Sequence, residues 1–346
     1  MYKLLIISVL FASCVAANAQ KGNKKTVETT LPTEIRVSWY NVENFFDTVN
    51  DPKINDEDFL PEGPYKWTNE RYAKKLTNIT KVFTEMGTPS VIGLCEVENA
   101  SVVADIAAAL GKDKFGFVHF DSPDERGIDV ALIYEKAVVK ILESEKITIG
   151  FPKTENGKTD YTRDILHVKA NIGGQRVHFY MNHWPSRREG QKESDPKRVF
   201  VAQQLKTNID KVQAKNPSEN IVVMGDLNDY FKNNSIAEVL KATLPTENTS
   251  PNQLYDVSES IKAAGKGTYF YKGEWDMLDH IIVNGMLCDK KNKLSVQDID
   301  VFKADFMLYA DKKSGKNLPS RTYSGPKYFG GYSDHLPILM TLKLTK

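Results

Sequence analysis

Six short clusters of polar residues stand at the ends of strand-like apolar runs, and their residue types are those that phosphoester hydrolysis uses. In chain order the clusters are Asn41-Val42-Glu43, Glu96 after VIGLC, Asn182-His183, Asp226-Leu227-Asn228 after IVVMG, Asp279 before HIIVN, and Ser333-Asp334-His335. Carboxylates, amides and imidazoles delivered by separate strands could form a magnesium-dependent phosphoesterase site. Packing alone does not explain so many clusters, because a buried carboxylate without a partner is costly.

Two pairs of these residues have arrangements that indicate separate roles. Asp226 and Asn228 are alternate residues after a strand, so both project from the same side if the chain stays extended. We expect Asp226 to orient or deprotonate the attacking water, or to hold a second metal, and Asn228 to donate to phosphate. An ordinary Asp-Asn turn is the alternative for this pair. Asp279 would fix the tautomer of His335 and raise its basicity.

Two further histidines and a basic run complete the candidate residues. His183 is expected to donate to phosphate or to act as general acid toward the leaving group. His280 follows Asp279 in an alternating strand, faces away from it, and is interpreted as structural. The basic run after His183 consists of Arg187, Arg188, Lys192, Lys197 and Arg198. Such a run is usually a solvated surface, but its position favours contact with substrate phosphate.

An alternation of strands and helices must position these clusters. Strand patterns cover residues 35–41, 91–95, 115–120, 129–134, 164–170, 176–183, 221–228, 278–284, 295–302 and 335–344. Helical spacing of apolar residues predicts a helix capped by Thr68 or Asn69, a second over 101–110, and a third opened by Ser194-Asp195-Pro196. No internal repeat or linker separates the clusters, so one domain of two packed sheets with outer helices is the simplest architecture.

The N-terminal residues have the pattern of a secretory signal. Lys3 precedes an apolar run over 4–17, and Ala17-Asn18-Ala19 resembles a cleavage site. We therefore predict a signal peptide over 1–19, a flexible lead-in over 20–33 and a catalytic domain over 34–346. Export to the periplasm or the extracellular space follows, with lipid attachment through Cys14 as the alternative. The apolar run is too short for a comfortable membrane span, so no transmembrane anchor is expected.

Composition and charge agree with a soluble globular protein. The chain has 346 residues, of which 41% are hydrophobic and 26% charged. It carries 46 Lys and Arg against 45 Asp and Glu, and removal of Lys3 with the signal leaves 45 of each. No global basic field draws it to nucleic acid, so any attraction must come from a local patch. The remaining cysteines, Cys95 and Cys288, provide no disulfide framework.

The motifs WYNVEN, GLCEVEN, NHWPSR, GDLND, LDHIIVN and GYSDHLP stand in the order found in a known family. They resemble the endonuclease/exonuclease/phosphatase superfamily, which includes pancreatic deoxyribonucleases, apurinic endonucleases, inositol polyphosphate 5-phosphatases and sphingomyelinases. The resemblance extends over residues 34–344, and WYNVENFFD is most similar to secreted bacterial extracellular nucleases. It implies a four-layer α/β/β/α sandwich of two packed mixed sheets with outer helices and a site at one end.

The resemblance and the residue chemistry together suggest metal ligands. Mg²⁺ prefers oxygen ligands and retains several waters, so one or two carboxylates suffice. Glu96 is the first expected ligand, helped by Asn41, Glu43 and Asp334. Glu43 resembles an Asp of the apurinic endonucleases, and its longer side chain is a departure from that pattern. Mn²⁺ and Ca²⁺ are alternatives to Mg²⁺.

Three arginines are expected to bind substrate. Arg163 resembles a family position near the phosphate, with a surface salt bridge as the alternative. Arg126 lies where the family places a loop near substrate, although Gly127 also makes an ordinary turn there. Arg187 belongs to the basic run. Tyr323, Tyr328 and Tyr332 stand among glycines and would either stack on bases or pack their loop.

These observations lead to three function hypotheses. The leading one is an exported Mg²⁺-dependent phosphodiesterase, an endonuclease that hydrolyses nucleic acid by metal-assisted in-line attack of water. The second is a phosphatase or phospholipase of the same fold, acting on inositol phosphates or sphingomyelin. The third, a non-catalytic binding module, is disfavoured because the charged residues of the site are all retained. We expect a monomer with no obligate protein partner; DNA and RNA both stay open as substrates, because selectivity resides in loops.

Overall fold

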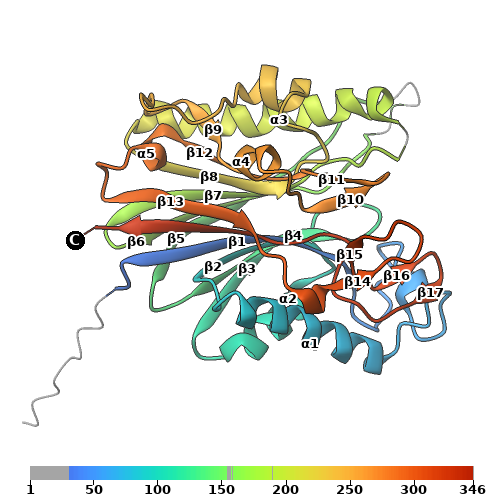
Figure 1. The fold of residues 1–346 in the computed structure, drawn as a ribbon. Coiled ribbons are helices and arrows are strands. Elements are labelled where there is room, and N and C mark those ends of the chain that lie inside the picture. Colours follow the sequence, from blue (N-terminus) through green and yellow to red (C-terminus); the bar gives the residue numbers. More distant parts are fainter. Residues whose placement is uncertain (1–30, 154–156, 158, 189, 346) are drawn as a thin grey trace, which may run out of the picture. The chain divides into compact units, whose positions relative to one another are not determined.

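Two six-stranded sheets pack face to face, and helices cover their outer surfaces (Figure 1). The structure is a computed structural model that describes residues 31–153, 157, 159–188 and 190–345. The first sheet has the order β13 (Leu294–Val301), β18 (Ile338–Leu344), β1 (Glu34–Phe45), β2 (Val91–Val97), β4 (Asp129–Glu135) and β3 (Phe115–His119). The second has the order β5 (Val139–Ile147), β6 (Ile165–Ile172), β7 (Gln175–His183), β8 (Asn220–Asp226), β12 (Asp279–Asn284) and β9 (Leu254–Asp256).

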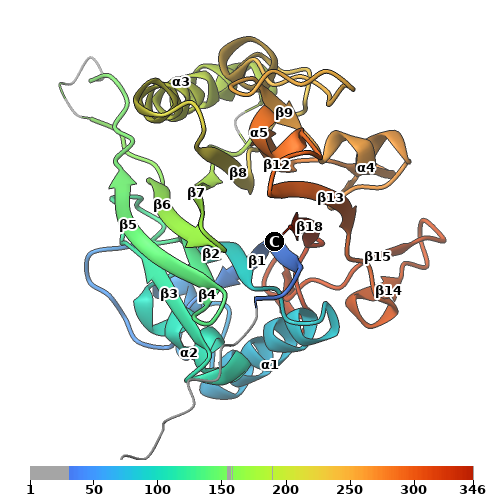
Figure 2. The ribbon, with the colours of Figure 1, turned by 90° about the vertical axis from the view of Figure 1, so that its left-hand side faces the viewer.

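The helices form the two outer layers. Helices α1 (Asn69–Glu85) and α2 (Ala100–Gly111) cover the first sheet, and α3 (Gln191–Lys215) covers the second (Figures 1 and 2). Shorter helices are α4 (Glu259–Ala263), α5 (Gly285–Cys288), the π-helical η2 (Ser235–Leu240), and the 3₁₀ turns η1 (Glu57–Phe59) and η3 (Asp305–Met307). The layers confirm the expected α/β/β/α sandwich of mixed sheets.

Three small hairpins gather at one end of the sandwich, at the right of Figure 1. They are β10 (Tyr269–Tyr271) with β11 (Glu274–Asp276), β14 (Leu308–Ala310) with β15 (Asn317–Pro319), and β16 (Tyr323–Ser324) with β17 (Lys327–Tyr328). Their connecting loops bring late segments of the chain to the same end as the carboxyl ends of β1 and β8.

Each sheet contains one parallel pair of strands, and these two pairs locate the site. β1 is parallel to β2 and β7 is parallel to β8, whereas every other pairing within the two large sheets is antiparallel. A parallel pair needs a long crossover, which α1 supplies for the first pair and α3 for the second. Parallel strands end at the same edge, so the polar residues that follow each pair are brought together.

Alternation along the strands divides the core into layers. Val177, Phe179 and Met181 of β7 are buried against the first sheet, whereas Tyr180 faces the α3 side. Gly93 of β2 faces Met224 of the second sheet, and a Cβ placed on it would lie 2.5 Å from the Met224 sulfur. The glycine therefore permits the close approach of the two sheets.

The helix starts differ in part from the sequence-based expectation. Thr68 caps α1 by accepting a hydrogen bond from the Arg71 amide. Helix α3 begins at Gln191, not at Ser194, so the expectation that Ser194-Asp195-Pro196 opens this helix was wrong. The buried Arg198 side chain donates to the Gln191 carbonyl and the Ser194 hydroxyl, which stabilises the extra N-terminal turn. A local capping pattern could not reveal that long-side-chain contact.

The proposed signal peptide over 1–19 and all but 31–33 of the proposed lead-in lie outside the described residues. Within the described part, Leu31–Lys346 groups as one compact unit. None of its helices combines the length and apolarity needed to cross a bilayer.

Candidate active site

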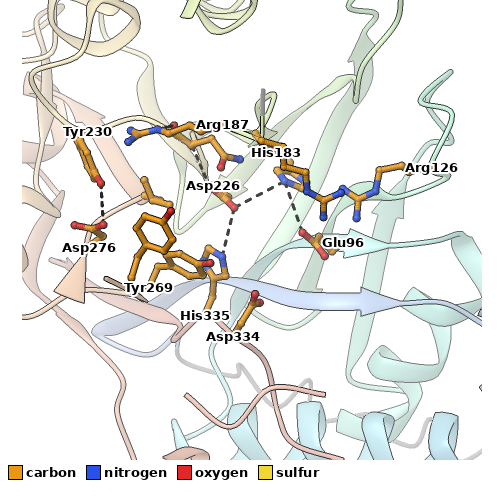
Figure 3. Close-up of a pocket in the computed structure, with 15 residues that line it drawn as sticks. Glu96, Arg126, His183, Arg187, Asp226, Tyr230, Tyr269, Asp276, Asp334 and His335 are labelled. Atoms are coloured by element: carbon orange, nitrogen blue, oxygen red, sulfur yellow. Dashed lines mark hydrogen bonds and ion pairs between the residues drawn. The ribbon is translucent and has the colours of Figure 1, made fainter. Parts of the chain in front are cut away.

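Four of the six polar clusters line one cleft at the end of the sandwich where the small hairpins lie, and a fifth, Asp279, is buried behind His335. Figure 3 shows side chains from both sheets and from the late loops pointing into this cleft. Its lining includes Glu96 from β2, His183 from β7, Asp226 and Asn228 from β8 and its following turn, and Asp334 and His335 from the loop before β18. The sixth cluster, at Asn41, Val42 and Glu43, borders this cleft from the end of β1.

Asp279 and His335 form a buried carboxylate–imidazole pair. The Asp279 Oδ2 atom lies 2.6 Å from Nδ1 of His335 and accepts a hydrogen bond of 2.5 Å from the Thr268 hydroxyl. Trp39 Nε1 donates to the other Asp279 oxygen at 2.9 Å. Burial lowers the pKa of His335, but the Asp279 charge and hydrogen bond outweigh burial and raise that pKa well above its usual value. The pair therefore favours an imidazolium fixed in one orientation.

Asp226 lies between the two imidazoles. Its Oδ2 atom is 3.8 Å from Nε2 of His335 and 3.9 Å from Nε2 of His183, and it accepts a hydrogen bond of 3.1 Å from the Asn41 amide. Burial and then the nearby Asp279 carboxylate raise the pKa of Asp226 to about 7. Its position between two imidazoles suits a group that orients or deprotonates water.

His183 is held neutral by its surroundings. Burial, followed by the charges of Arg163 and Arg126, keeps the pKa of His183 well below its usual value. Its Nε2 atom faces Glu96 Oε1 and Asp226 Oδ2, each at 3.9 Å. Its buried Nδ1 atom makes no hydrogen bond to any described residue. A neutral imidazole in this position can donate one hydrogen bond to a ligand oxygen.

Glu96 presents its carboxylate to the cleft from a constrained backbone. Its two oxygens accept from the Asn41 amide at 3.3 Å and from the Asn44 backbone N–H at 2.9 Å. The φ angles of Glu43, Asn44, Glu96 and Asn228 are 54°, 48°, 62° and 50°. Side-chain-bearing residues rarely adopt this left-handed region, and such strain concentrates at functional sites.

Glu43 and Asp334 have basic partners. The Glu43 carboxylate accepts from the Thr322 N–H at 2.6 Å and lies 3.8 Å from Lys75 Nζ and 3.7 Å from Arg321 Nε. Arg321 also forms a short hydrogen bond with Asp334. Burial and then the Asp334 charge raise the pKa of Glu43 to about 7. Both residues border the cleft, but ligation of a cation would compete with these contacts.

The donor set fits a divalent cation at Glu96. Carboxylate oxygens of Glu96 and Asp226 converge there, and burial followed by the Asp279 charge raises the pKa of Asp226, an effect that a cation would offset. Asn41 faces both carboxylates with its Nδ2 group, whereas its Oδ1 accepts from the Glu43 N–H, so the amide would have to turn before its oxygen could bind a cation. Asp226, Asp279 and His335 also place ligand atoms within 4.8 Å of one another. Both Asp279 oxygens are already taken by Trp39, Thr268 and His335, so we interpret this second group as a hydrogen-bonded relay.

Asp226 and Asn228 both face the cleft, but not for the reason expected from their spacing. The chain does not stay extended after β8, because Asn228 is in the left-handed region with φ 50°. Both side chains nevertheless line the cleft. The Asn228 amide donates to the Trp184 carbonyl at 3.0 Å, and the Asn228 N–H donates to Asp226 Oδ1 at 3.1 Å. The turn is thus part of the site and not an alternative to it.

The three predicted substrate arginines occupy different positions. Arg126 lies at the cleft beside Glu96 (Figure 3) and donates to Asn44 Oδ1 at 2.9 Å. Arg187 lines the opposite side, stacks over the Tyr230 ring at 4.0 Å, and donates to the Asn228 carbonyl at 2.6 Å. Arg163 is buried, so the surface salt bridge weighed for it was wrong.

Arg163 contacts the backbone at the end of β7, next to the cleft. It donates to the carbonyls of His183 and Trp184 at 3.2 and 2.8 Å, and it pairs with Asp124 at 3.2 Å. This geometry makes Arg163 a positioning residue for His183. It also borders a shallow side pocket, so phosphate contact through it stays a prediction.

The basic run divides in the structure. Arg187 and Arg188 line the cleft, and Lys197 borders the side pocket. Arg198 has no exposed surface and pairs with Asp229 at 2.8 Å, so its inclusion in a substrate-binding patch was wrong. The position of Arg198 on α3 explains why it differs from its neighbours, because it lies on the buried face of the helix. His280 is buried against Asp256 at 2.7 Å, in agreement with its structural interpretation.

A second hollow continues the cleft on the side of Glu43. Glu96, Arg126, Arg188 and Asp334 line both hollows, so the two are continuous. The second hollow adds Arg321 and three aromatic residues, Phe59, Tyr65 and Tyr323. The Tyr65 and Tyr323 rings lie 4.9 Å apart, and Tyr65 stacks on Phe59 at the same distance. Tyr323 therefore both packs its loop and faces the cleft.

Several residues of the site were not identified from the sequence. Trp39 and Thr268 orient Asp279, and the Tyr269 ring lies 4.8 Å from the His335 ring. Asp229 is the last residue of GDLND, and that position was the one available signal for its buried pairing with Arg198. No local pattern marks Thr268, because it is ordinary in a loop.

Comparisons with known proteins agree with this architecture. The model of the Endonuclease/Exonuclease/phosphatase family matches residues 36–344. A D. rerio TDP2 complexed with single strand DNA product has 17% identity and a TM-score of 0.55, with 90% of this chain and 100% of that chain covered. An endonuclease/exonuclease/phosphatase from Bacteroides vulgatus has 14% identity and a TM-score of 0.56, covering 91% and 100%.

The human Nocturnin catalytic domain with bound sulfate anion has 15% identity and a TM-score of 0.55, covering 91% of this chain and 96% of that chain. No curated protein sequence matches. At these identities the structural likeness shows the fold alone, whereas the family model covers nearly the whole described chain. The chain therefore belongs to the endonuclease/exonuclease/phosphatase family.

Proposed function

We propose that this protein is a divalent-metal-dependent phosphodiesterase, an Mg²⁺-dependent endonuclease that hydrolyses nucleic acid. One observation carries the proposal: Glu96, Asp226, His183 and the Asp279–His335 pair meet on the floor of a cleft that arginines flank. Phosphoester hydrolysis needs oxygen ligands for a cation, a group that orients water, and donors to phosphate oxygens. This cleft contains all three.

The residues of the cleft have separable roles in this reaction. Glu96, with Asn41 and Asp226 nearby, would hold the cation, which would neutralise charge on the phosphoryl oxygens. Asp226 is the residue that orients the attacking water, because its carboxylate faces both imidazoles. Glu43 and Asp334 could bind the cation only if the contacts of Glu43 with Lys75 and of Asp334 with Arg321 were broken.

The two imidazoles act on phosphate oxygens. His335 is an imidazolium oriented by Asp279, so its Nε2–H can donate to a nonbridging oxygen. Neutral His183 can donate one hydrogen bond from Nε2, which supports the phosphate-donor role better than that of general acid. Asn228 donates one N–H of its amide to the Trp184 carbonyl, which leaves the second N–H for a phosphate oxygen.

The shape of the cleft favours a polymeric substrate. The two continuous hollows extend the site on both sides of Glu96, with arginines and aromatic rings along their length. Base stacking on aromatic side chains and phosphate contact with arginines are the usual elements of single-strand binding. The D. rerio TDP2 neighbour was determined with a single strand DNA product, which adds support by analogy of fold. Export, proposed from residues 1–19, would place the enzyme outside the cytoplasm.

Nicking of supercoiled plasmid tests the proposal. We expect the purified protein to nick plasmid with Mg²⁺ and to lose this activity with chelator, in Glu96→Gln and in His335→Ala. Glu145→Gln removes an exposed glutamate of β5 and serves as the matched control, with activity unchanged. Full activity in Glu96→Gln would exclude the proposed site. Absence of nicking by the folded protein, with hydrolysis of inositol phosphates or sphingomyelin, would favour a phosphatase or phospholipase.

A further inference from the structure

We propose that His119, Asp121 and Asp129 form a second divalent-cation site, outside the catalytic cleft, which takes a transition-metal ion of the Zn²⁺ type. His119 ends β3, Asp121 follows it in the loop, and Asp129 begins β4. One ligand atom from each of the three lies within 4.8 Å of the other two. The group therefore joins the two strands at the edge of the first sheet.

The hydrogen-bond geometry of His119 points to a cation. Nδ1 lies 3.2 Å from the Val130 carbonyl oxygen, and Nε2 lies 3.1 Å from Asp121 Oδ1. Both neighbours are acceptors, but a neutral imidazole has only one N–H. Either tautomer thus leaves a nitrogen lone pair facing an oxygen. A cation bound by Nε2 and Asp121, with Nδ1–H donating to Val130, resolves this conflict and reproduces the usual second-shell support of a metal-binding histidine.

The alternative is an imidazolium paired with Asp121, and the surroundings oppose it. The His119 side chain is only 1% exposed, so an imidazolium there would lose its hydration. The Asp121 side chain is 82% exposed and can turn toward solvent, so this pairing would gain little. A cation bound by both side chains would account for the position of Asp121 beside Nε2.

Asp129 supplies a buried carboxylate that lacks a cationic partner. It is 3% exposed, and its two oxygens both accept from one N–H, that of Ser122, at 3.2 and 3.1 Å. Among the described residues no lysine or arginine forms an ion pair with it. A buried carboxylate in this state is destabilising unless it is protonated or bound to a cation.

The donor set selects the class of ion. One imidazole nitrogen and two carboxylate oxygens, with water completing the set, suit Zn²⁺, whereas Mg²⁺ prefers oxygen alone. Tetrahedral ligands at about 2.1 Å from Zn²⁺ lie about 3.4 Å apart. The 3.1 Å between His119 Nε2 and Asp121 Oδ1 is already in this range. The ligand atom of Asp129 lies within 4.8 Å of the other two and would move closer when the ion binds.

The site lies next to a loop that reaches the catalytic cleft. Residues 120–128 connect the proposed ligands, and they carry Asp124 and Arg126. Asp124 pairs with Arg163, which supports His183, and Arg126 contacts Asn44 beside Glu96. A cation that ties both ends of this loop would hold Arg126 in place. The site would thus stabilise the substrate side of the cleft without taking part in the reaction.

Zn²⁺ binding to the full chain in excess Mg²⁺ tests the proposal, by calorimetry and by the rise in melting temperature. We expect one Zn²⁺ that Mg²⁺ does not displace, bound at least tenfold more weakly by Asp121→Asn, Asp129→Asn and His119→Gln. Asp121→Asn is the decisive variant, because its exposed side chain can change without loss of the fold. His178→Gln changes another buried histidine and should leave Zn²⁺ binding unaltered.

Glu96→Gln separates this site from the catalytic one. We expect it to retain the Zn²⁺ and the associated rise in melting temperature, since its carboxylate belongs to a different strand and cleft. Two results would overturn the proposal. One is Zn²⁺ affinity unchanged in folded Asp121→Asn and Asp129→Asn, and the other is Zn²⁺ lost only in Glu96→Gln.

Discussion

The buried pair of Asp229 and Arg198 supports the catalytic cleft from beneath, and its removal should be costly. Both side chains have no exposed surface, and Asp229 Oδ2 lies 2.8 Å from Arg198 Nε. The same carboxylate accepts from Ser235 at 2.6 Å and pairs with Arg187 at 3.3 Å. Asp229→Asn keeps the size of the side chain but removes the charge, so it leaves a buried guanidinium without its counter-ion.

The expected loss follows from the burial of both partners. Breaking one side of a buried ion pair typically costs about 3–5 kcal/mol, because the remaining charge stays desolvated. For a domain of this size, about 2 °C of melting temperature per kcal/mol gives a fall of about 6–10 °C. Arg187 loses one of its contacts as well, so we also expect a raised KM for nucleic acid.

Urea unfolding followed by circular dichroism measures this loss in Asp229→Asn, in Arg198→Met and in the double variant. The double variant should recover at least about 2 kcal/mol relative to the sum of the single losses, since the fully buried guanidinium of Arg198 is then absent. Asp210→Asn is the control on α3, because it breaks only an exposed pair with Lys206 and should cost under about 0.5 kcal/mol. A loss below about 1 kcal/mol in Asp229→Asn, or simple additivity in the double variant, would refute the reasoning.

Three further predictions concern the cleft and its surroundings. Asp279→Asn should lower kcat about 10²–10⁴-fold with little change in KM, because the imidazole of His335 loses its orienting charge; steady-state kinetics on oligonucleotides checks this. Burial lowers the pKa of His280, but Asp256 outweighs it and raises that pKa to about 9 from 6.5. The resulting stabilisation of about 3 kcal/mol is fully present below pH 6.5 and lost as pH rises through 9, so urea midpoints should fall over this window in the wild type and much less in His280→Asn. Arg126→Met should raise KM about tenfold and reduce the salt dependence of binding by about one phosphate contact, measured by fluorescence anisotropy, and an unchanged slope would count against phosphate contact.

Much of the site was predictable because its residues follow buried strands. Glu96 comes directly after the buried run of β2, and Asp226 ends the buried run of β8. Strand periodicity and strand-end polarity involve neighbours in sequence, so they are visible without a fold. The same kind of pattern led to the wrong start for α3 and to the wrong surface placement of Arg198. The start of α3 depends on hydrogen bonds from Arg198 to Gln191 and Ser194, and the burial of Arg198 depends on its ion pair with Asp229. A local sequence pattern reveals neither.

The partners of the predicted residues could not be predicted at all. Trp39 and Asp279 are 240 positions apart, and Glu43 and Thr322 are 279 positions apart. Which of them meet depends on how the two sheets are aligned and on where the hairpins and loops between β12 and β18 fold back. Lys75 reaches Glu43 only because α1 packs beside that loop, and this changes Glu43 from an expected free ligand to a paired carboxylate.

The sequence by itself determined the family, the alternation of strands and helices, and the identity of most of the candidate catalytic and metal-binding residues. These properties follow from residue type and local periodicity, which the chain carries in any conformation. The tertiary structure decided the protonation of His183 and His335, the ion pairs of Glu43 and Asp334, and the grouping of His119, Asp121 and Asp129. Burial and charge–charge distance set all of these, and both quantities exist only once distant segments have packed together.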